Sequence, residues 1–120
     1  MSKQKKIIIV EDEVIIAECL AMELQIAGYE ILGNFTTGLE AIAAAQESKP
    51  DVILMDIHLS GNLNGIAAAE KIRTSSDCLI IFMTGFDKGD IMAQCQHLAN
   101  VAFLEKPVET YQVEEIITKL

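Results

Sequence analysis

Polar residues stand directly after four short apolar runs of this sequence. Carboxylates follow two of these runs, a hydroxyl and a glycine follow the next, and an ammonium follows the last: Glu11 and Asp12, Asp56, Thr84 and Gly85, and Lys106. In an open parallel sheet, ligands bind beyond the carboxyl ends of the strands, so strands in these places would bring the residues to one edge. We therefore expect one small site that combines three carboxylates, a hydroxyl and an ammonium.

The three carboxylates need positive charge close by. Two carboxylates about 5 Å apart repel each other by roughly 3 kcal/mol at an effective dielectric constant near 20, and three carboxylates form three such pairs. Lys106 alone does not offset that sum. Mg²⁺ does, because it takes carboxylate and carbonyl oxygens, keeps several waters and accepts phosphate as a further ligand. The sequence therefore predicts a pocket for Mg²⁺, or for Mn²⁺ in its place, and for a phosphate group.

Asp56 is the candidate nucleophile of this pocket. A carboxylate at the mouth of a central strand can attack phosphorus and form an aspartyl phosphate, while Lys106 and the Thr84 hydroxyl balance or hydrogen-bond the phosphoryl oxygens. Gly85 has no side chain and leaves access. Each residue could also serve only a turn or a helix end, but four such coincidences at one edge favour the site.

Four apolar runs and one weaker run predict the strands that position these residues. The four runs are rich in β-branched residues and lack alternation, as is typical of strands buried on both faces; they are residues 7–10, 52–55, 79–83 and 101–104. The weaker run, residues 30–35, indicates an edge strand. Segments of helical period occupy residues 14–27, 39–46, 65–73, 90–98 and 110–120. This alternation predicts a doubly wound α/β fold, in which a five-stranded parallel sheet has helices on both faces.

Three residues mark the ends of predicted helices. Gly28 can adopt the left-handed conformation that closes the first helix. Thr37 and Thr110 are candidate N-caps of the second and fifth helices.

The composition describes one compact acidic domain, residues 1–120. Nine lysines and arginines stand against 18 aspartates and glutamates, and the formal charge of −9 leaves few cations for nucleic acid or an anionic membrane. We expect neither as a direct partner. Residues 7–10 are too few for a signal peptide or a membrane span. The three cysteines favour reduced, buried thiols in a cytoplasmic protein: Cys19, Cys78 and Cys95.

Four motifs carry a resemblance to a known family: IIIVEDE at 7–13, VILMDIHL at 52–59, IIFMTG at 80–85 and FLEKP at 103–107. In this order and spacing, the sequence resembles the receiver domain of two-component response regulators over nearly all of its length. The resemblance implies a flavodoxin-like sheet with strand order 2-1-3-4-5. It also implies that Asp56 accepts a phosphoryl group from a histidine kinase or a histidine phosphotransfer protein, and that Lys106 contacts that group.

The resemblance also assigns the metal ligands and the residues that set phosphoryl lifetime. Four groups would hold Mg²⁺, three of them carboxylates and one a main-chain carbonyl: Glu11, Asp12, Asp56 and His58. The side chains of His58 and Phe86 would tune how fast the phosphoryl group is lost. His58 would hydrogen-bond or would simply be solvated, and His97 would lie at the surface of the fourth helix.

The resemblance also implies a switch that would couple Thr84 to Phe103. Phosphorylation adds about −1.5 to −2 charges and three acceptor oxygens, which can draw the Thr84 hydroxyl toward the site. Phe103 would then turn inward and repack the face formed by the fourth helix, fifth strand and fifth helix, although it could also be only a core or surface aromatic residue. This face would control an output domain or downstream protein, and would allow phosphorylation-dependent dimerisation through residues such as Ile91, Met92 and Tyr111.

Three other functions suit the sequence less well. A phosphohydrolase of the haloacid dehalogenase type needs a second aspartate where His58 stands, and a flavin-binding electron carrier needs a phosphate loop where residues 11–13 are acidic. A pseudo-receiver that only docks partners would not need the intact set of acids, threonine and lysine. We expect a signalling domain rather than an enzyme, because family members catalyse only their own phosphorylation and dephosphorylation.

Two features separate this chain from the common pattern. Ser60 stands where the family often has proline, and the loop 60–65 is one residue longer than the commonest form.

We expect no output domain within these 120 residues. The chain would be either a stand-alone regulator or the receiver of a longer regulator or hybrid kinase.

Overall fold

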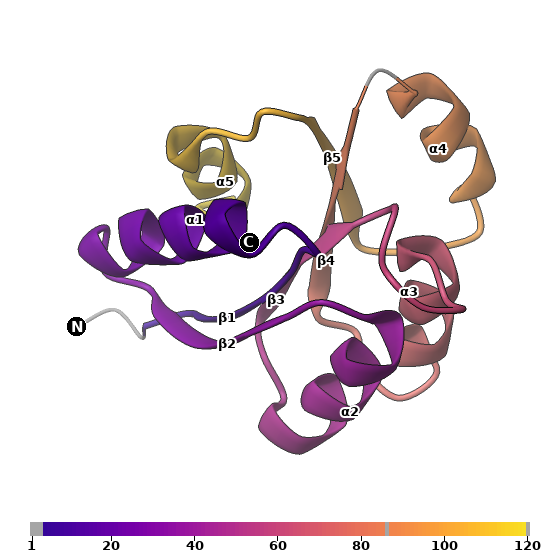
Figure 1. Ribbon diagram of the computed structural model, residues 1–120, viewed down its shortest axis with the longest axis horizontal. Helices are drawn as coiled ribbons and strands as arrows, with labels where there is room; N and C mark the ends of the chain where they lie inside the picture. Colours follow the sequence, from indigo (N-terminus) through magenta and orange to yellow (C-terminus); the bar gives the residue numbers. More distant parts are fainter. Residues whose placement is uncertain (1–3, 86, 120) are drawn as a thin grey trace.

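Strands and helices alternate along the whole described chain (Figure 1). The computed structural model describes residues 4–85 and 87–119. The strands are β1 (Lys6–Val10), β2 (Glu30–Phe35), β3 (Val52–Asp56), β4 (Leu79–Thr84) and β5 (Val101–Glu105). The helices are α1 (Val14–Ile26), α2 (Gly38–Ser48), α3 (Gly65–Arg73), α4 (Lys88–Gln94) and α5 (Thr110–Ile117). Every predicted strand and helix is confirmed, with ends that differ by a few residues.

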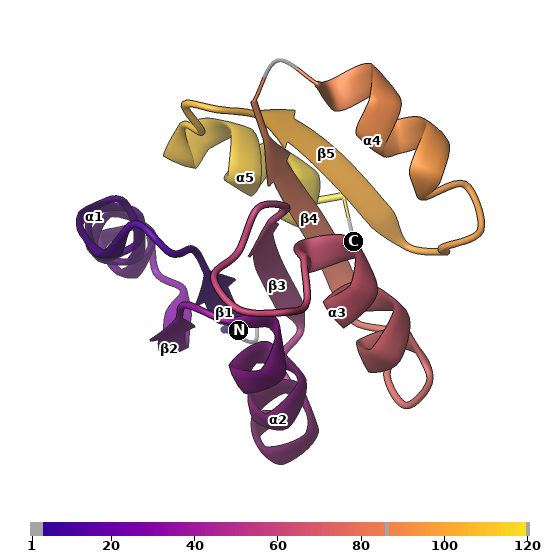
Figure 2. The ribbon, with the colours of Figure 1, turned by 45° about the vertical axis from the view of Figure 1, so that its right-hand side comes forward.

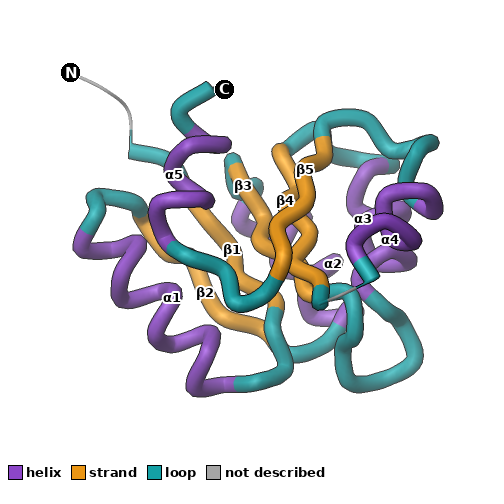
Figure 3. Tube along the Cα trace, turned by 90° about the horizontal axis from the view of Figure 1, so that it is seen from above, coloured by secondary structure: helices purple, strands orange, loops and turns teal. Residues whose placement is uncertain are grey.

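The sheet is parallel and has the order β2-β1-β3-β4-β5. Figure 3 shows it between two helix layers, with α1 and α5 on one face and α2, α3 and α4 on the other. Successive residues of β1 enter different cores: Ile7 and Ile9 pack with α1 and α5, and Ile8 and Val10 pack with the other layer. Both faces need apolar side chains, so the predicted doubly wound α/β fold and its strand order are confirmed.

The fourth apolar run differs from its prediction. Residues 101–104 are only partly buried, because β5 forms one edge of the sheet beside α4 and α5 (Figure 2). The central strand β3 and its neighbour β4 are buried along their whole length. The weaker run forms the opposite edge, β2, as predicted.

Two of the three predicted helix-end residues are confirmed. Thr37 caps α2 by accepting a hydrogen bond from the Glu40 N–H at 3.2 Å, and Gly28 follows α1 with a φ of 107°. The prediction for Thr110 is wrong: α5 starts at that residue, and Glu109 precedes it as the N-cap. The Thr110 hydroxyl instead donates to the Glu23 carboxylate, which ties α5 to α1.

Two burial assignments change, and His97 keeps its predicted surface position but lies outside α4. Cys95 is buried and Cys78 is half-buried, but Cys19 is exposed and lines the surface between α1 and the β5–α5 connection, so the prediction of buried thiols is wrong for Cys19. Ile91 is only 4% exposed and packs in the core, which removes it from the predicted dimer face, whereas Met92 and Tyr111 are exposed. α4 ends at Gln94, so His97 is exposed beyond that helix and pairs with Glu70 at 2.7 Å.

Among the described residues, no helix has both the length and the apolar character to cross a bilayer.

Candidate functional site

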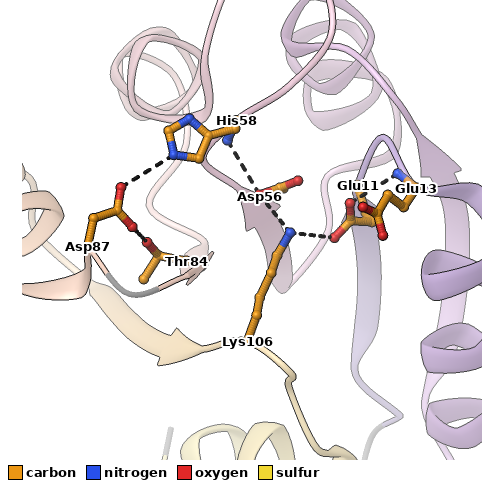
Figure 4. A network of polar contacts seen from close by, with 7 residues as sticks. All are labelled: Glu11, Glu13, Asp56, His58, Thr84, Asp87 and Lys106. Carbon is orange, nitrogen blue, oxygen red and sulfur yellow. Dashed lines mark hydrogen bonds and ion pairs between the residues drawn. The ribbon is translucent and has the colours of Figure 1, made fainter.

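The carboxyl ends of four strands bring the predicted residues to one edge of the sheet (Figure 4). Asp56 ends β3 and Thr84 ends β4, while Glu11 follows β1 and Lys106 follows β5. Glu11, Asp56 and Thr84 are 2%, 3% and 1% exposed. The buried strand ends therefore fix these polar groups where water solvates them poorly.

Lys106 joins two of the buried carboxylates. Its Nζ lies 3.0 Å from Oε1 of Glu11 and 3.0 Å from Oδ1 of Asp56. Its main-chain N–H donates to the Thr84 carbonyl at 2.7 Å, which attaches the β5–α5 connection to the end of β4. Burial alone would lower the pKa of Lys106, but the hydrogen bonds and negative charges of Asp56 and Glu11 raise it on balance. The ammonium is thus held charged beside the acids.

The acidic residues form a cluster with the donor set of a magnesium site. Glu11, Asp12 and Asp56 each offer a carboxylate oxygen, and these oxygens lie within 4.8 Å of one another. Glu11 uses Oε2 to accept the N–H of Glu13 at 3.0 Å. Its buried Oε1 lies 3.0 Å from Nζ of Lys106, and among the described residues no other donor reaches it. The cluster therefore has oxygen lone pairs to spare and is compatible with Mg²⁺.

A second polar network lies beside the first. The Thr84 hydroxyl donates to Oδ1 of Asp87 at 2.5 Å, and Oδ2 of Asp87 lies 3.3 Å from Nε2 of His58 (Figure 4). The hydrogen bond from Thr84 is the main cause that lowers the pKa of Asp87. Asp87 was not among the site residues predicted from the sequence, and only its place three residues after Thr84, in the same strand-end loop, could have pointed to it.

His58 is both hydrogen-bonded and solvated, and Phe103 packs against another aromatic ring. The His58 side chain is 74% exposed even though its ring meets Asp87, and its main-chain N–H points at Oδ1 of Asp56 over 3.4 Å. Phe103 is half-buried and stacks on Phe82, with ring centroids 5.5 Å apart. Gly85 has open space around its α-carbon. Phe86 lies outside the described residues.

The loop after β3 is tied down at several points. Ser60 forms a β-bridge with Thr37, and Asn64 caps α3 by accepting the Ala67 N–H at 2.8 Å. The N–H of Gly65 donates to the Ile57 carbonyl at 2.8 Å. These contacts hold the start of α3 directly against the backbone that follows β3.

A hollow of about 480 Å³ opens beside the acidic cluster, between α1 and the β5–α5 connection. Its wall is mainly apolar, with Glu11 and Lys106 also lining it; the apolar residues include Ile15, Ile16, Leu20, Met83 and Val108. A partner that approaches the acidic cluster from this side would therefore meet an apolar surface next to it.

Comparison with known proteins identifies the family to which the chain belongs. A family model described as the response regulator receiver domain matches residues 7–118. The transcriptional regulatory protein PdtaR of Mycobacterium tuberculosis is 34% identical over 86% of this chain and 50% of its own length. The chemotaxis protein CheY of Thermotoga maritima is 29% identical over 97% of both chains.

A solved structure leads to the same family. The signal receiver domain of a modulated diguanylate cyclase from Desulfovibrio desulfuricans superposes with a TM-score of 0.88 at 30% identity, over 98% of this chain and 93% of that one. The chain spans about half the length of PdtaR. PdtaR is named as a transcriptional regulatory protein and CheY as a chemotaxis protein. This chain therefore belongs to the response regulator receiver domains, the phosphoacceptor domains of two-component signalling.

Proposed function

We propose that the chain accepts a phosphoryl group on Asp56 from a histidine kinase or a histidine phosphotransfer protein, in a Mg²⁺-dependent reaction. The observation that carries this proposal is the Lys106 ammonium, 3.0 Å from the buried Asp56 and 3.0 Å from the buried Glu11. A buried carboxylate beside a fixed cation and a second acid suits transfer of a highly charged group. Residues 1–120 would act as one receiver domain.

The proposed transfer is a displacement at phosphorus. An Oδ atom of Asp56 attacks, the bond from phosphorus to the donor's imidazole nitrogen breaks, and that nitrogen keeps the electron pair. Lys106 is close enough to Asp56 to contact the transferred group. Mg²⁺ or Mn²⁺, held by Glu11, Asp12, Asp56 and the main-chain carbonyl of His58, would supply positive charge to the phosphoryl oxygens. The Lys106 ammonium would hold the group close to the attacking oxygen, and the acids would serve as the ligands of the metal.

The switched state would be read at the face of α4, β5 and α5. Met92 and Tyr111 are exposed there, at 45% and 61%. In this proposal Thr84 turns toward the phosphoryl group, and the change reaches the face through Phe103. The face then controls an output domain or a downstream protein, with a second copy of the chain as the alternative partner.

Mg²⁺ is expected to raise the melting temperature, because the metal would relieve repulsion within the acidic cluster. At a free concentration of 100 times Kd, the gain in unfolding free energy is about 2.7 kcal/mol, or on the order of 10 °C for a domain of this size. Thermal unfolding with MgCl₂, against NaCl of equal ionic strength, measures it. The variant Asp12→Asn, at an exposed position, should lose most of the gain. A melting temperature that Mg²⁺ leaves unchanged, or an equal rise in Asp12→Asn, speaks against the metal site.

Phosphorylation is tested by intact-mass measurement after incubation with acetyl phosphate. The wild type should gain one phosphoryl unit with Mg²⁺ and none with excess chelator. Asp56→Asn should gain none, while Asp77→Asn, an exposed aspartate far along the chain, should behave as the wild type. A wild type that gains nothing would favour a pseudo-receiver that only docks partners.

A further inference from the structure

Asp87 connects two residues of the site with its two carboxylate oxygens. Oδ1 accepts the hydrogen bond from the Thr84 hydroxyl at 2.5 Å, and Oδ2 lies 3.3 Å from Nε2 of His58. Figure 4 shows this network to one side of Asp56, while Lys106 reaches Asp56 from another. Thr84 is 1% exposed, so few acceptors can reach its hydroxyl.

The side chain of Asp87 does not serve the helix that follows it. Asp87 is the N-cap residue of α4, a position where an aspartate usually accepts a hydrogen bond from the first turn. Here the side chain makes no such bond. Its carboxylate is directed to Thr84 and His58 instead, so its placement concerns the site rather than the stability of α4.

We propose that Asp87 is a positioning residue that holds the Thr84 hydroxyl in the unphosphorylated protein and competes with the phosphoryl group for it. This inference rests on the proposed function, in which Asp56 is phosphorylated. A threonine hydroxyl has one proton to donate. It therefore cannot donate to Asp87 and to a phosphoryl oxygen at the same time.

The strength of the Thr84–Asp87 bond sets the cost of the switch. A hydrogen bond to an ionised acceptor is among the stronger ones in proteins. When the binding-competent state is only partly populated, the apparent dissociation constant rises by the inverse of that fraction. Removing the Asp87 acceptor should therefore raise the population in which Thr84 can turn to the phosphoryl group, by about tenfold.

His58 links this competition to the phosphoacceptor. Its main-chain N–H points at Oδ1 of Asp56 over 3.4 Å, and its ring meets Asp87. The residue thus spans the distance between the carboxylate that would be phosphorylated and the carboxylate that holds Thr84. A phosphoryl group on Asp56 would arrive between the two networks.

The first measurement uses the unphosphorylated full chain. Three-bond couplings of the Thr84 methyl group report its side-chain rotamer in solution. The wild type and Asp90→Asn, which removes one charge from the first turn of the same helix, should both show one dominant rotamer. Asp87→Ala should show averaging. A rotamer that stays fixed in Asp87→Ala overturns the inference, and this result does not depend on any phosphodonor.

The second measurement separates the hydrogen bond from the charge of Asp87. Affinity for beryllofluoride, a mimic of the phosphoryl group, is measured with Mg²⁺ for Asp87→Ala and Asp87→Asn. Both variants lose the same charge, but asparagine keeps a carbonyl oxygen that can accept from Thr84. We expect about fivefold tighter binding for Asp87→Ala than for Asp87→Asn, because the neutral amide holds the Thr84 hydroxyl less strongly than the carboxylate does. Equal affinities would mean that only charge matters and would overturn the inference.

The two proposals fail in different ways. If the wild type neither binds beryllofluoride nor gains a phosphoryl group, the proposed function is wrong, and with it the claim of competition. If the wild type binds and the two Asp87 variants are alike, only the inference about Asp87 is wrong.

Discussion

Gly65→Ala is expected to unfold or distort the site and to abolish phosphorylation, although it adds only one methyl group. A β-carbon at this position would lie 2.2 Å from the carbonyl oxygen of Asp56 and 3.0 Å from the α-carbon of Ile57. Both neighbours are backbone, so no side-chain rotation relieves the contact. The start of α3 or the end of β3 must move, at a cost of roughly 3 kcal/mol in unfolding free energy.

The matched control for this substitution is Gly89→Ala. Gly89 lies inside α4, and a β-carbon there meets nothing within 4 Å. Alanine in a helix is favoured over glycine by up to about 1 kcal/mol, so this variant should be as stable as the wild type or more so. Denaturant unfolding measures both variants. A Gly65→Ala protein that keeps wild-type stability and still gains a phosphoryl group would show that the start of α3 can move away from the end of β3 without cost.

Lys106→Met is expected to cost on the order of 3 kcal/mol in the absence of metal, because it leaves two buried carboxylates without their cation. Glu11 and Asp56 both contact this ammonium at 3.0 Å. The same variant should bind Mg²⁺ more tightly, since a competing positive charge has left the cluster. Chemical unfolding with and without Mg²⁺ measures both effects, with Lys71→Met, at an exposed position of α3, as the control.

The stability difference between wild type and Lys106→Met should depend on pH in a defined direction. The pKa of Lys106 is raised in the folded protein from its ordinary value of 10.5. A raised pKa means that the folded state holds the proton more tightly, so its contribution is complete below 10.5 and is lost as the pH rises through the folded value. The difference should be constant from pH 7 to about pH 9.5 and shrink at higher pH. A difference that grows above pH 10.5 would contradict this assignment of the ion pair.

The elements of the fold could be predicted because their signals are local. Runs such as residues 52–55 are short, apolar at every position and rich in β-branched residues, as is typical of a strand covered on both faces. Thr37 and Glu40 form a capping box that can be recognised from their spacing alone. The burial of β5 could not be judged in this way, because an edge strand and a central strand can have the same composition and differ only in their neighbours.

The site was predictable where it depends on strand ends and was missed where it depends on a loop. The positions of Asp56, Thr84 and Lys106 follow from the rule that parallel strands end at one edge. Asp87 belongs to a connection whose path no periodicity describes, and its role depends on the direction of one side chain. The N-cap of α5 was predicted one residue too late, at Thr110. The Gln112 side chain accepts the N–H of Glu109, and Glu109 is therefore the N-cap.

The most direct test of the central claim is to locate the phosphoryl group in the chain. Borohydride reduces an aspartyl phosphate to homoserine, so reduction after incubation with acetyl phosphate and Mg²⁺ marks the acceptor, and peptide mass spectrometry identifies it. We predict homoserine at Asp56, absent when Mg²⁺ is chelated. Homoserine at another aspartate, or at Asp56 to the same extent without divalent metal, would contradict the account.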